Sequence, residues 1–518
     1  MKNSIGKPYE GILHVRFDEG GTDSLTNFII FVEKKIMNRL SGSTLLPNYE
    51  KETKMKFIMT KNTLIIITFL LIAGCSSVPK VWKIETQEEW QAINAKSSNL
   101  EIKEGLICPQ NDSAYLSLIL YKNKKKCKLQ SITLKQTPQW DNWQKTPKVT
   151  PKMANDAPVF IPVSPGNYWF LARYKGDNMN GYHSWHSTDM KNWNHYGPVS
   201  SLSNKWVTSA EYFNGRFYIY FDKPNDEDPH LIIDEDLTDG KQGKEIGMVL
   251  DDPSHGSDMA IFRDDDGTFH IIYEDWSPLD ASKHAWDSPL AGHADSPDGI
   301  HGFEPHEFPA PIDKRSTPTG KIEPYKPHPN QIIPGKDLSP YNYEVHDGPQ
   351  DAFGDYTVIK VGQGYYIFCD YDSHQEDKTM RVGRWLSDDI TKQFVWDGEI
   401  GEDFHPDPTI GFAEGKFYLL VQRNDCDYIS DGPWVDGVEI RAGVDTDNDG
   451  SIDNWTKFTK LKEVYSQKTG FVRVVETLPA TLYVSELEAG YAFKIEMRFY
   501  SKDGVFPILD SFEAKFID

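Results

Sequence analysis

The stretch Gly256–Asp275, GSDMAIFRDDDGTFHIIYED, contains the unit on which most of this chain is built. The acid Asp258 stands directly before an apolar run, and the turn Asp264–Gly267 separates this run from a second one, Thr268–Tyr273. Two strand-like runs around an Asp-Gly turn predict a β-hairpin.

Four other stretches repeat this hairpin at a spacing of roughly 50 residues, which is nearly doubled once, between the third and fourth copies. Their paired runs are residues 157–163 and 168–174, 209–213 and 216–221, 356–361 and 365–371, and 408–412 and 416–422. Between the hairpins, Ser187–Trp193 and Trp385–Asp389 suit outer strands. Four-stranded units that recur about every 40–50 residues are typical of β-propellers.

We therefore predict an all-β protein with a five-bladed β-propeller over residues 151–470. A short N-terminal lead-in, residues 75–150, precedes the ring, and β-rich strands at residues 471–518 close or flank it. Within the lead-in, Thr86–Ala95 has helical spacing with a capping box at Thr86 and Glu89. A β-sandwich with regular hairpins is the alternative for the repeated part.

The charge of the chain narrows the class of partner. The sequence has 518 residues and a net charge of −23, which argues against nucleic acid or an acidic membrane surface as the main partner. An anionic substrate stays open, because local basic residues can override a global field.

An export signal is expected near the N-terminus. A basic start at Met55 or Met59 precedes the apolar run Leu64–Ala73, which is too short to span a bilayer. The run ends in Ala-Gly-Cys, and this resembles the bacterial lipoprotein box, whose Cys becomes the lipid-modified N-terminus. Cys75 would then carry the lipid, and a buried helix that ends at a chance Gly-Cys is the alternative.

The resemblance to a lipoprotein sets the expected location. Residues 55–74 would be the signal peptide, and residues 1–54 a mis-called extension. Ser76 after the Cys fits a bacterial outer-membrane destination, facing the periplasm or the cell surface. In such an oxidising space Cys108 could pair with Cys127, although buried thiols are the alternative.

A long stretch, Trp276–Gly348, separates the third and fourth hairpins and is rich in Pro, Gly, Asp and His. A loop of this length inside a compact domain is usually functional or disordered, and we expect it to form a wall of the binding site. Trp185, Trp276 and Trp286 could stack on sugar faces there, with plain core tryptophans as the alternative.

Four acids occupy one place in the repeat, directly before an inner strand: Asp156, Asp258, Asp355 and Asp407. In a propeller the innermost strands face the axis, so these carboxyls should meet at one mouth. Carboxyls that share a pocket push their pKa values apart, and glycoside hydrolysis needs one protonated acid and one ionised base. The alternative for any one of them is a turn residue that bonds its own backbone.

Two hairpins carry a family resemblance. Trp206 with Tyr212–Tyr218 looks like the second-blade phrase of glycoside hydrolase family 43, and Asp258-Met259 with Asp264–Gly267 looks like its third-blade phrase. Roughly residues 150–470 thus resemble the five-bladed propeller glycosidases of family 43 and the related family 117. Family 43 contains β-xylosidases and α-L-arabinofuranosidases, and family 117 cleaves anhydrogalactose from agar oligosaccharides.

The resemblance implies inverting hydrolysis with Asp156 as general base and Asp258 as the group that tunes the acid. Asp355 stands where family 43 carries a general acid, a Glu in Glu-Gly-Pro, whereas this chain reads Phe-Gly-Asp-Tyr. His346 is therefore the alternative acid, since family 117 is thought to use a His; Glu344 and Asp351 are also near. His405-Pro406-Asp407-Pro408 resembles a first-blade phrase but stands in the last blade, so His405 and Asp407 are assigned to substrate binding.

Residues 445–453, Asp-Thr-Asp-Asn-Asp-Gly-Ser-Ile-Asp, match most of a calcium loop through Asp445, Asp447, Asp449 and Asp453. Position 12 is Thr456 rather than Glu, so a weak Ca²⁺ site or a plain acidic turn is expected. No cofactor is required by the predicted chemistry.

The prediction is an exo-acting glycosidase, β-xylosidase-like or related, on algal or plant cell-wall oligosaccharides such as xylan- or ulvan-type chains. Three alternatives stay open. One is a family-117-like anhydrogalactosidase on agar oligosaccharides, and the second is a non-catalytic surface glycan-binding lipoprotein. The third is a polysaccharide lyase with a Tyr or His base near Arg173, Arg381 or Arg384.

Overall fold

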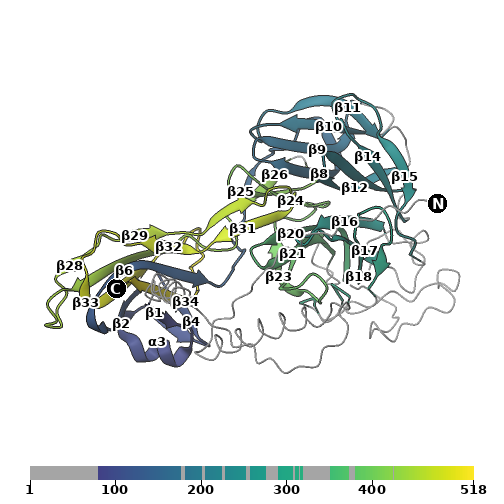
Figure 1. Ribbon diagram of the computed structural model, residues 1–518. Helices are drawn as coiled ribbons and strands as arrows, with labels where there is room; N and C mark the ends of the chain where they lie inside the picture. Colours follow the sequence, from purple (N-terminus) through teal and green to yellow (C-terminus); the bar gives the residue numbers. More distant parts are fainter. Residues whose placement is uncertain are drawn as a thin grey trace, which may run out of the picture. The chain divides into compact units, whose positions relative to one another are not determined.

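The computed structural model describes residues 80–176, 181–200, 205–223, 228–252, 257–275, 290–306, 310–313, 316–318, 351–372, 380–423 and 425–517. Its repeated part forms five separate sheets, and the innermost strands β8, β12, β16, β20 and β24 contact one another in that order around a ring. The predicted all-β, five-bladed propeller is thereby confirmed (Figure 1). All five predicted hairpins form the inner two strands of the blades.

The first blade contains β8 (Ala154–Ser164), β9 (Asn167–Tyr174), β10 (Tyr182–Ser187) and β11 (Asn194–Ser200). The second contains β12 (Trp206–Phe213), β13 (Arg216–Asp222), β14 (Pro229–Asp234) and β15 (Lys244–Met248). The third contains β16 (Ser257–Arg263), β17 (Phe269–Asp275), β18 (Leu290–Ser296) and β19 (Glu304–Pro305). The fourth contains β20 (Ala352–Val361), β21 (Gly364–Asp372), β22 (Arg381–Ser387) and β23 (Val395–Ile400). The fifth contains β24 (Thr409–Ala413), β25 (Lys416–Leu420), β26 (Cys426–Ser430) and β7 (Gln144–Pro147).

The fifth blade closes the ring with a strand from the other end of the domain. Its outermost strand, β7, comes from before the first blade and pairs antiparallel with β26, so that Pro147 lies opposite Cys426. This end of the expected lead-in, residues 75–150, therefore belongs to the ring and closes it. Propellers close in this way because an open last blade would expose an unpaired edge.

Hydroxyl side chains join neighbouring inner strands near the axis. Thr409 Oγ1 accepts a hydrogen bond from Phe160 N at 3.2 Å, and Thr357 Oγ1 accepts one from Ile410 N at 3.3 Å. Ser209 Oγ does the same for Ile261 N at 3.1 Å. These bonds satisfy backbone groups that a strand without a lateral neighbour would leave unpaired.

A second domain is built from both ends of the chain. The N-terminal elements are β1 (Lys80–Ile84), α3 (Gln87–Ile93), β2 (Asn94–Ser98), β3 (Leu100–Lys103), β4 (Leu106–Pro109), β5 (Tyr115–Leu118) and β6 (Tyr121–Gln136). The C-terminal ones are β27 (Val438–Asp445), β28 (Asn454–Trp455), β29 (Thr459–Leu461), β32 (Ala480–Tyr483), β33 (Gly490–Phe499) and β34 (Leu509–Ile517). Together these strands form one 12-stranded sheet around a single apolar core.

This terminal domain differs from the expected lead-in and tail. The strand β6 pairs with both β33 and β34, so segments more than 350 residues apart share one sheet. The short helix is confirmed, with the capping box of Thr86 and Glu89 in place. No disulfide joins the cysteines among the described residues, so the pairing of Cys108 with Cys127 is wrong.

A hairpin from the C-terminal part reaches into the ring. Its strands are β30 (Val464–Gln467) and β31 (Val474–Leu478), and β31 pairs parallel with β20. The adjacent Arg473 is 1% exposed and donates to Ala210 O at 2.8 Å and to Phe160 O at 3.1 Å, on two inner strands. Glu211, fully buried 3.7 Å away, balances its charge, so this hairpin fills the end of the ring away from the strand starts.

Two smaller expectations are corrected. Ser187–Trp193 is the turn between β10 and β11 rather than an outer strand, whereas Trp385 does lie on the third strand of its blade. Among the described residues, no helix has the length and apolar character to span a membrane.

Candidate active site

The acids that begin the inner strands share one backbone conformation. Asp156, Asp258, Asp355 and Asp407 all have positive φ, at 60°, 43°, 51° and 55°. Asp tolerates this left-handed region better than most residues because its short side chain can bond locally. In β8, β16 and β20 the pairing register shifts at the acid, so the acid lies in a β-bulge.

The bulges explain why the acids gather at one mouth. The inner strands run in the same direction from the acid toward the hairpin, so their starts lie at one end of the ring. In the second blade the residue at the bulge is Thr208 instead of an acid. The starts of the five inner strands therefore bring four carboxyls and one hydroxyl to the same mouth of the ring.

Asp156 is held but accessible. Its Oδ1 accepts a hydrogen bond from Gln422 Nε2 at 2.7 Å, and its Oδ2 lies 3.0 Å from Arg173 Nε, while 28% of the side chain is exposed. The Arg173 guanidinium in turn lies over the Trp206 ring, 4.7 Å from its centroid. A carboxylate fixed at both oxygens and open to water can accept a proton from a water molecule.

Asp407 lies in the most crowded part of the mouth. Its Oδ2 accepts a hydrogen bond from Ala157 N at 3.3 Å, and its own backbone N donates to Asp370 Oδ1 at 3.0 Å. Carboxylate oxygens of Asp355, Asp370 and Asp407 lie within 4.8 Å of one another.

The pKa of Asp407 is raised to about 6, chiefly by burial; a hydrogen bond with Asp355 opposes the rise, and the charge of Asp156 adds to it. The Asp407 carboxyl holds a proton up to about pH 6 and is hydrogen-bonded to Asp355, so the two carboxyls share a proton at mildly acidic pH. The assignment of Asp407 to substrate binding alone therefore understates its chemistry.

Asp258 stands on the opposite side of the mouth. Its backbone N donates to Asp222 Oδ2 at 3.0 Å, and Asp222 is fully buried at the end of β13. This bond fixes the start of the third blade's inner strand.

Of a second layer of polar side chains, sequence reasoning named only Arg173, as a candidate for lyase chemistry, and missed the other four. These residues lie where the second strand of each blade ends beside the acid: Arg173, Asp222, Glu274, Asp370 and Gln422. The sequence does contain a signal for them: in each of the five hairpins, the second apolar run ends in a polar residue. This layer supports the acids by hydrogen bonds and charge, as the contacts of Gln422 and Asp370 show.

Two predicted substrate contacts are corrected. Trp185 is only 3% exposed and packs in the first blade against Phe170 and His195, so the core alternative holds. His405 is 1% exposed, with Nδ1 2.8 Å from Tyr428 Oη and Nε2 3.2 Å from Asp425 Oδ1. Its buried ring positions the segment before Asp407 instead of facing a sugar.

Several predicted residues lie outside the described residues: Trp276, Trp286, Glu344, His346 and Cys75. The stretch Trp276–Gly348 is not one long loop, because part of it forms the outer strands β18 and β19 of the third blade. There His293 is 1% exposed, and its Nε2 lies 3.0 Å from His270 Nδ1. Asp351 is also 1% exposed, so it is poorly placed to serve as the acid.

The arginines considered for lyase chemistry are mostly structural. Arg384 is 1% exposed and bonds Asp397 at 2.7 Å, and Arg381 pairs with Asp403 at 2.7 Å. Arg173 does reach the mouth, but the nearby Tyr182 is fully buried and burial raises its pKa well above the ordinary value. A tyrosine of this kind is a poor base.

The acidic loop after β27 fits calcium only in part. Oxygens of Asp445, Asp447 and Asp453 lie within 4.8 Å of one another. Both Asp445 oxygens accept backbone hydrogen bonds, from Asn448 N and Gly450 N, as in a closed acidic turn. Thr456, at the twelfth position, accepts from Ala442 N and so bonds the adjacent strand.

Known structures are similar to this chain at low identity. The endo-arabinase from Bacteroides thetaiotaomicron is 10% identical with a TM-score of 0.38, covering 55% of this chain and 95% of that one. A glycoside hydrolase family 43 arabinoxylan arabinofuranohydrolase from Bacillus subtilis is 10% identical with a TM-score of 0.36, covering 70% and 96%. An α-L-arabinofuranosidase from Clostridium thermocellum is 14% identical with a TM-score of 0.36, covering 59% and 93%.

No family model and no curated protein matches the chain. Any activity of this chain therefore rests on the residues of its own mouth.

Proposed function

We propose that this protein is a glycoside hydrolase that acts by single displacement at the propeller mouth. The observation that carries the proposal is a pair of carboxyls in different surroundings: Asp156 is anchored and accessible, and Asp407 is held with a raised pKa beside Asp355. Inverting hydrolysis needs a base for water and an acid for the leaving oxygen.

In this proposal Asp156 removes a proton from the attacking water. Gln422 and Arg173 fix the carboxylate, so its free lone pairs point in a constant direction. The proton for the leaving oxygen comes from the Asp355–Asp407 pair, and Asp370 keeps Asp407 in place through the backbone N. Asp258 orients the sugar from the third blade.

The proposed substrates are algal or plant cell-wall oligosaccharides of the xylan or ulvan type, attacked from a chain end. The resemblance of the second- and third-blade phrases to family 43 supports this choice. A family-117-like agar oligosaccharide is the second substrate class, with His346 as the acid. We also propose that Cys75 carries a lipid that holds the enzyme at the outer membrane.

One experiment tests the activity without choosing a substrate in advance. The purified chain is incubated with xylan, arabinan, agar and ulvan fragments, and released sugars are separated by chromatography. We expect one substrate to yield monosaccharide or its anhydro form, and Asp156→Asn to yield none. Binding without release by the wild-type chain would instead support a non-catalytic glycan-binding lipoprotein.

A further inference from the structure

A groove on the flank of the propeller has a composition unlike the rest of the chain. It lies between the connection from β7 to β8 and the turn from β10 to β11, and its volume is about 860 Å³. This volume falls within the range of about 300–1,000 Å³ that is usual for ligand sites. None of its lining residues belongs to the acids of the mouth, so we name it the flank groove and treat it separately.

The lining of the flank groove carries positive charge and no carboxylate. Lys152 and Lys191 are exposed, and Lys148, which also lines it, is neutralised by Asp427 at 2.6 Å. The whole chain has a net charge of −23, so a groove lining with no Asp or Glu differs from the average composition of the chain. Two unneutralised ammonium groups would favour an anionic ligand.

The nearest acid in the turn does not cancel these charges. The Asp189 carboxylate accepts hydrogen bonds from Lys191 N at 2.9 Å and from Asn192 N at 2.8 Å. These backbone bonds hold the pKa of Asp189 well below its ordinary value and direct the carboxylate into its own turn. The Lys191 ammonium is left to face solvent.

The groove also offers groups that suit a sugar ring. Trp193 is half-buried, and its indole Nε1 donates to Val149 O at 2.8 Å, which fixes the ring against the connection. Asn194 is exposed beside it, and Asn192 is also exposed, with its amide held in place because Nδ2 donates to Asp189 Oδ2 at 2.7 Å. A fixed aromatic face with amides and ammonium groups around it is a common arrangement for stacking and hydrogen bonding a saccharide.

We propose that the flank groove is a second carbohydrate-binding site, which takes a segment of an oligosaccharide bearing carboxylate or sulfate groups. It would hold a charged chain on the enzyme surface independently of cleavage at the mouth. Uronates and sulfate esters both present an anionic group that lysine can bind. The test below therefore uses a separate probe for each of these two groups.

The test measures binding in the Asp156→Asn background, so that cleavage does not consume the probe. The probes are polygalacturonate for uronates, a sulfated galactan for sulfate esters, and neutral arabinan. Affinity is followed by electrophoretic retardation and by calorimetry. The test variant is Lys152→Glu with Lys191→Glu, and Lys152→Gln with Lys191→Gln is a milder version of it.

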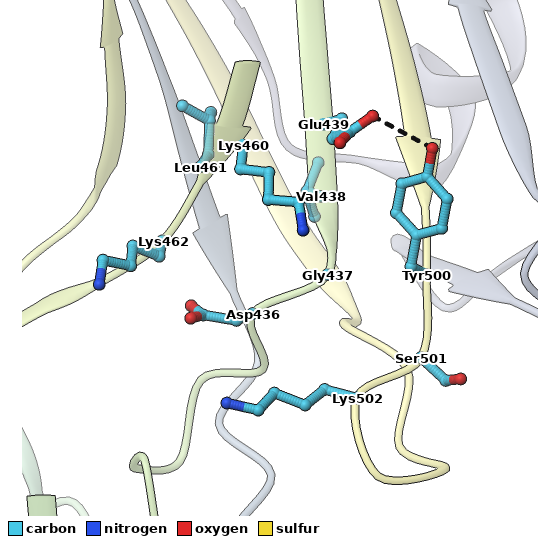
Figure 2. A pocket seen from close by; sticks show the side chains of 10 residues that line it. All are labelled: Asp436, Gly437, Val438, Glu439, Lys460, Leu461, Lys462, Tyr500, Ser501 and Lys502. Carbon is cyan, nitrogen blue, oxygen red and sulfur yellow. Dashed lines mark hydrogen bonds between the residues drawn. The ribbon is translucent and has the colours of Figure 1, made fainter. Parts of the chain in front are cut away.

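The terminal domain supplies a matched control. A pocket of about 330 Å³ there is lined by Lys460, Lys462 and Lys502, but also by Asp436 and Glu439 (Figure 2). Figure 2 shows the Asp436 carboxylate among the lysines, and Tyr500 Oη donates to Glu439 at 3.1 Å. Lys460→Glu with Lys462→Glu makes the same charge change in a pocket that already holds carboxylates.

We expect at least one anionic probe to bind, with higher affinity at low salt. The Glu variant of the flank groove should weaken the affinity for this probe roughly tenfold or more, and the Gln variant should weaken it less. The control variant should bind as the parent does, and thermal melting should show both variants folded. If only one anionic probe binds, the groove recognises that probe's group, carboxylate or sulfate. If both bind, negative charge alone is enough for recognition. The proposal is overturned if no anionic probe binds, if arabinan binds equally well, or if flank and control variants lose the same affinity.

Discussion

Replacing Asp407 by Asn should remove activity and at the same time stabilise the fold at alkaline pH. The pKa of Asp407 is raised from the usual 3.8 to about 6, chiefly by burial and then by the charge of Asp156. The folded state therefore binds this proton more tightly than the unfolded state. The resulting contribution to the free energy of unfolding is most favourable below about pH 4 and is lost as the pH rises to about 6.

The size of the effect follows from the shift. Each pKa unit corresponds to about 1.4 kcal/mol, so the ionised Asp407 costs the fold up to about 3 kcal/mol above pH 6. Asn avoids the charge, and its side-chain oxygen can still accept a hydrogen bond from Ala157 N. Asp407→Asn should thus gain stability at pH 8 and change little at pH 4.

Urea denaturation at both pH values measures the gain in the free energy of unfolding. The loss of activity is measured as kcat/KM on the identified substrate, and we expect it to be about 10²–10⁴-fold. Wild-type activity should also fall above about pH 6, as the shared proton is lost. Asp403→Asn is the control, because Asp403 lies in the same segment but is 48% exposed beside Arg381. A variant that is active, or that is destabilised equally at both pH values, would refute the shared proton.

The remaining predictions concern other residues. Asp355→Asn should slow hydrolysis of natural substrates about 10²–10⁴-fold, but should affect an activated aryl glycoside less, because its leaving group needs little protonation. If Asp355→Asn keeps full activity while His346→Ala loses it, the acid is His346. Cys75→Ala should move the protein from the membrane to the soluble fraction or leave it uncleaved, and unchanged fractionation would rule out the anchor. If calcium binds the loop at Asp445 and Asp447, millimolar Ca²⁺ should raise the melting temperature of the wild type but not of Asp445→Asn, and an equal response in both would exclude the loop.

Much of the propeller is encoded locally, which is why the sequence predicts it. Each hairpin has its own turn, as in Asn214-Gly215, and four of the five have a leading acid whose short side chain accepts a positive φ. These signals lie within about 20 residues of one another, so a reader of the sequence can recover them without knowing the partners in space. The convergence of Asp156 and Asp258 on one mouth follows from the repeat itself.

The parts that the sequence did not predict depend on distant partners. Nothing in Gln144–Pro147 indicates that its edge pairs with Cys426–Ser430, and nothing in Tyr121–Gln136 indicates its pairing with Leu509–Ile517. Trp185 is a residue type that suits a core as well as a sugar face, and only its burial decides between them.

The acid was the hardest part of the site to predict. The family resemblance points to Asp355 in the fourth blade, whereas the shared proton depends on Asp407 in the fifth, which is adjacent only after the ring closes. A pKa shift that arises from burial and a neighbouring charge has no signature in the sequence around either residue.

The central claim is that Asp156 activates water at the propeller mouth in an inverting hydrolysis. Time-resolved proton NMR of the first released sugar tests it most directly, with wild type and Asp156→Asn compared on the best substrate from the chromatographic screen. We expect the initial product of the wild type to have the anomeric configuration opposite to that of the substrate, and Asp156→Asn to be at least about 100-fold slower while still binding. A product with retained configuration, or an Asp156→Asn variant with full turnover, would contradict the account.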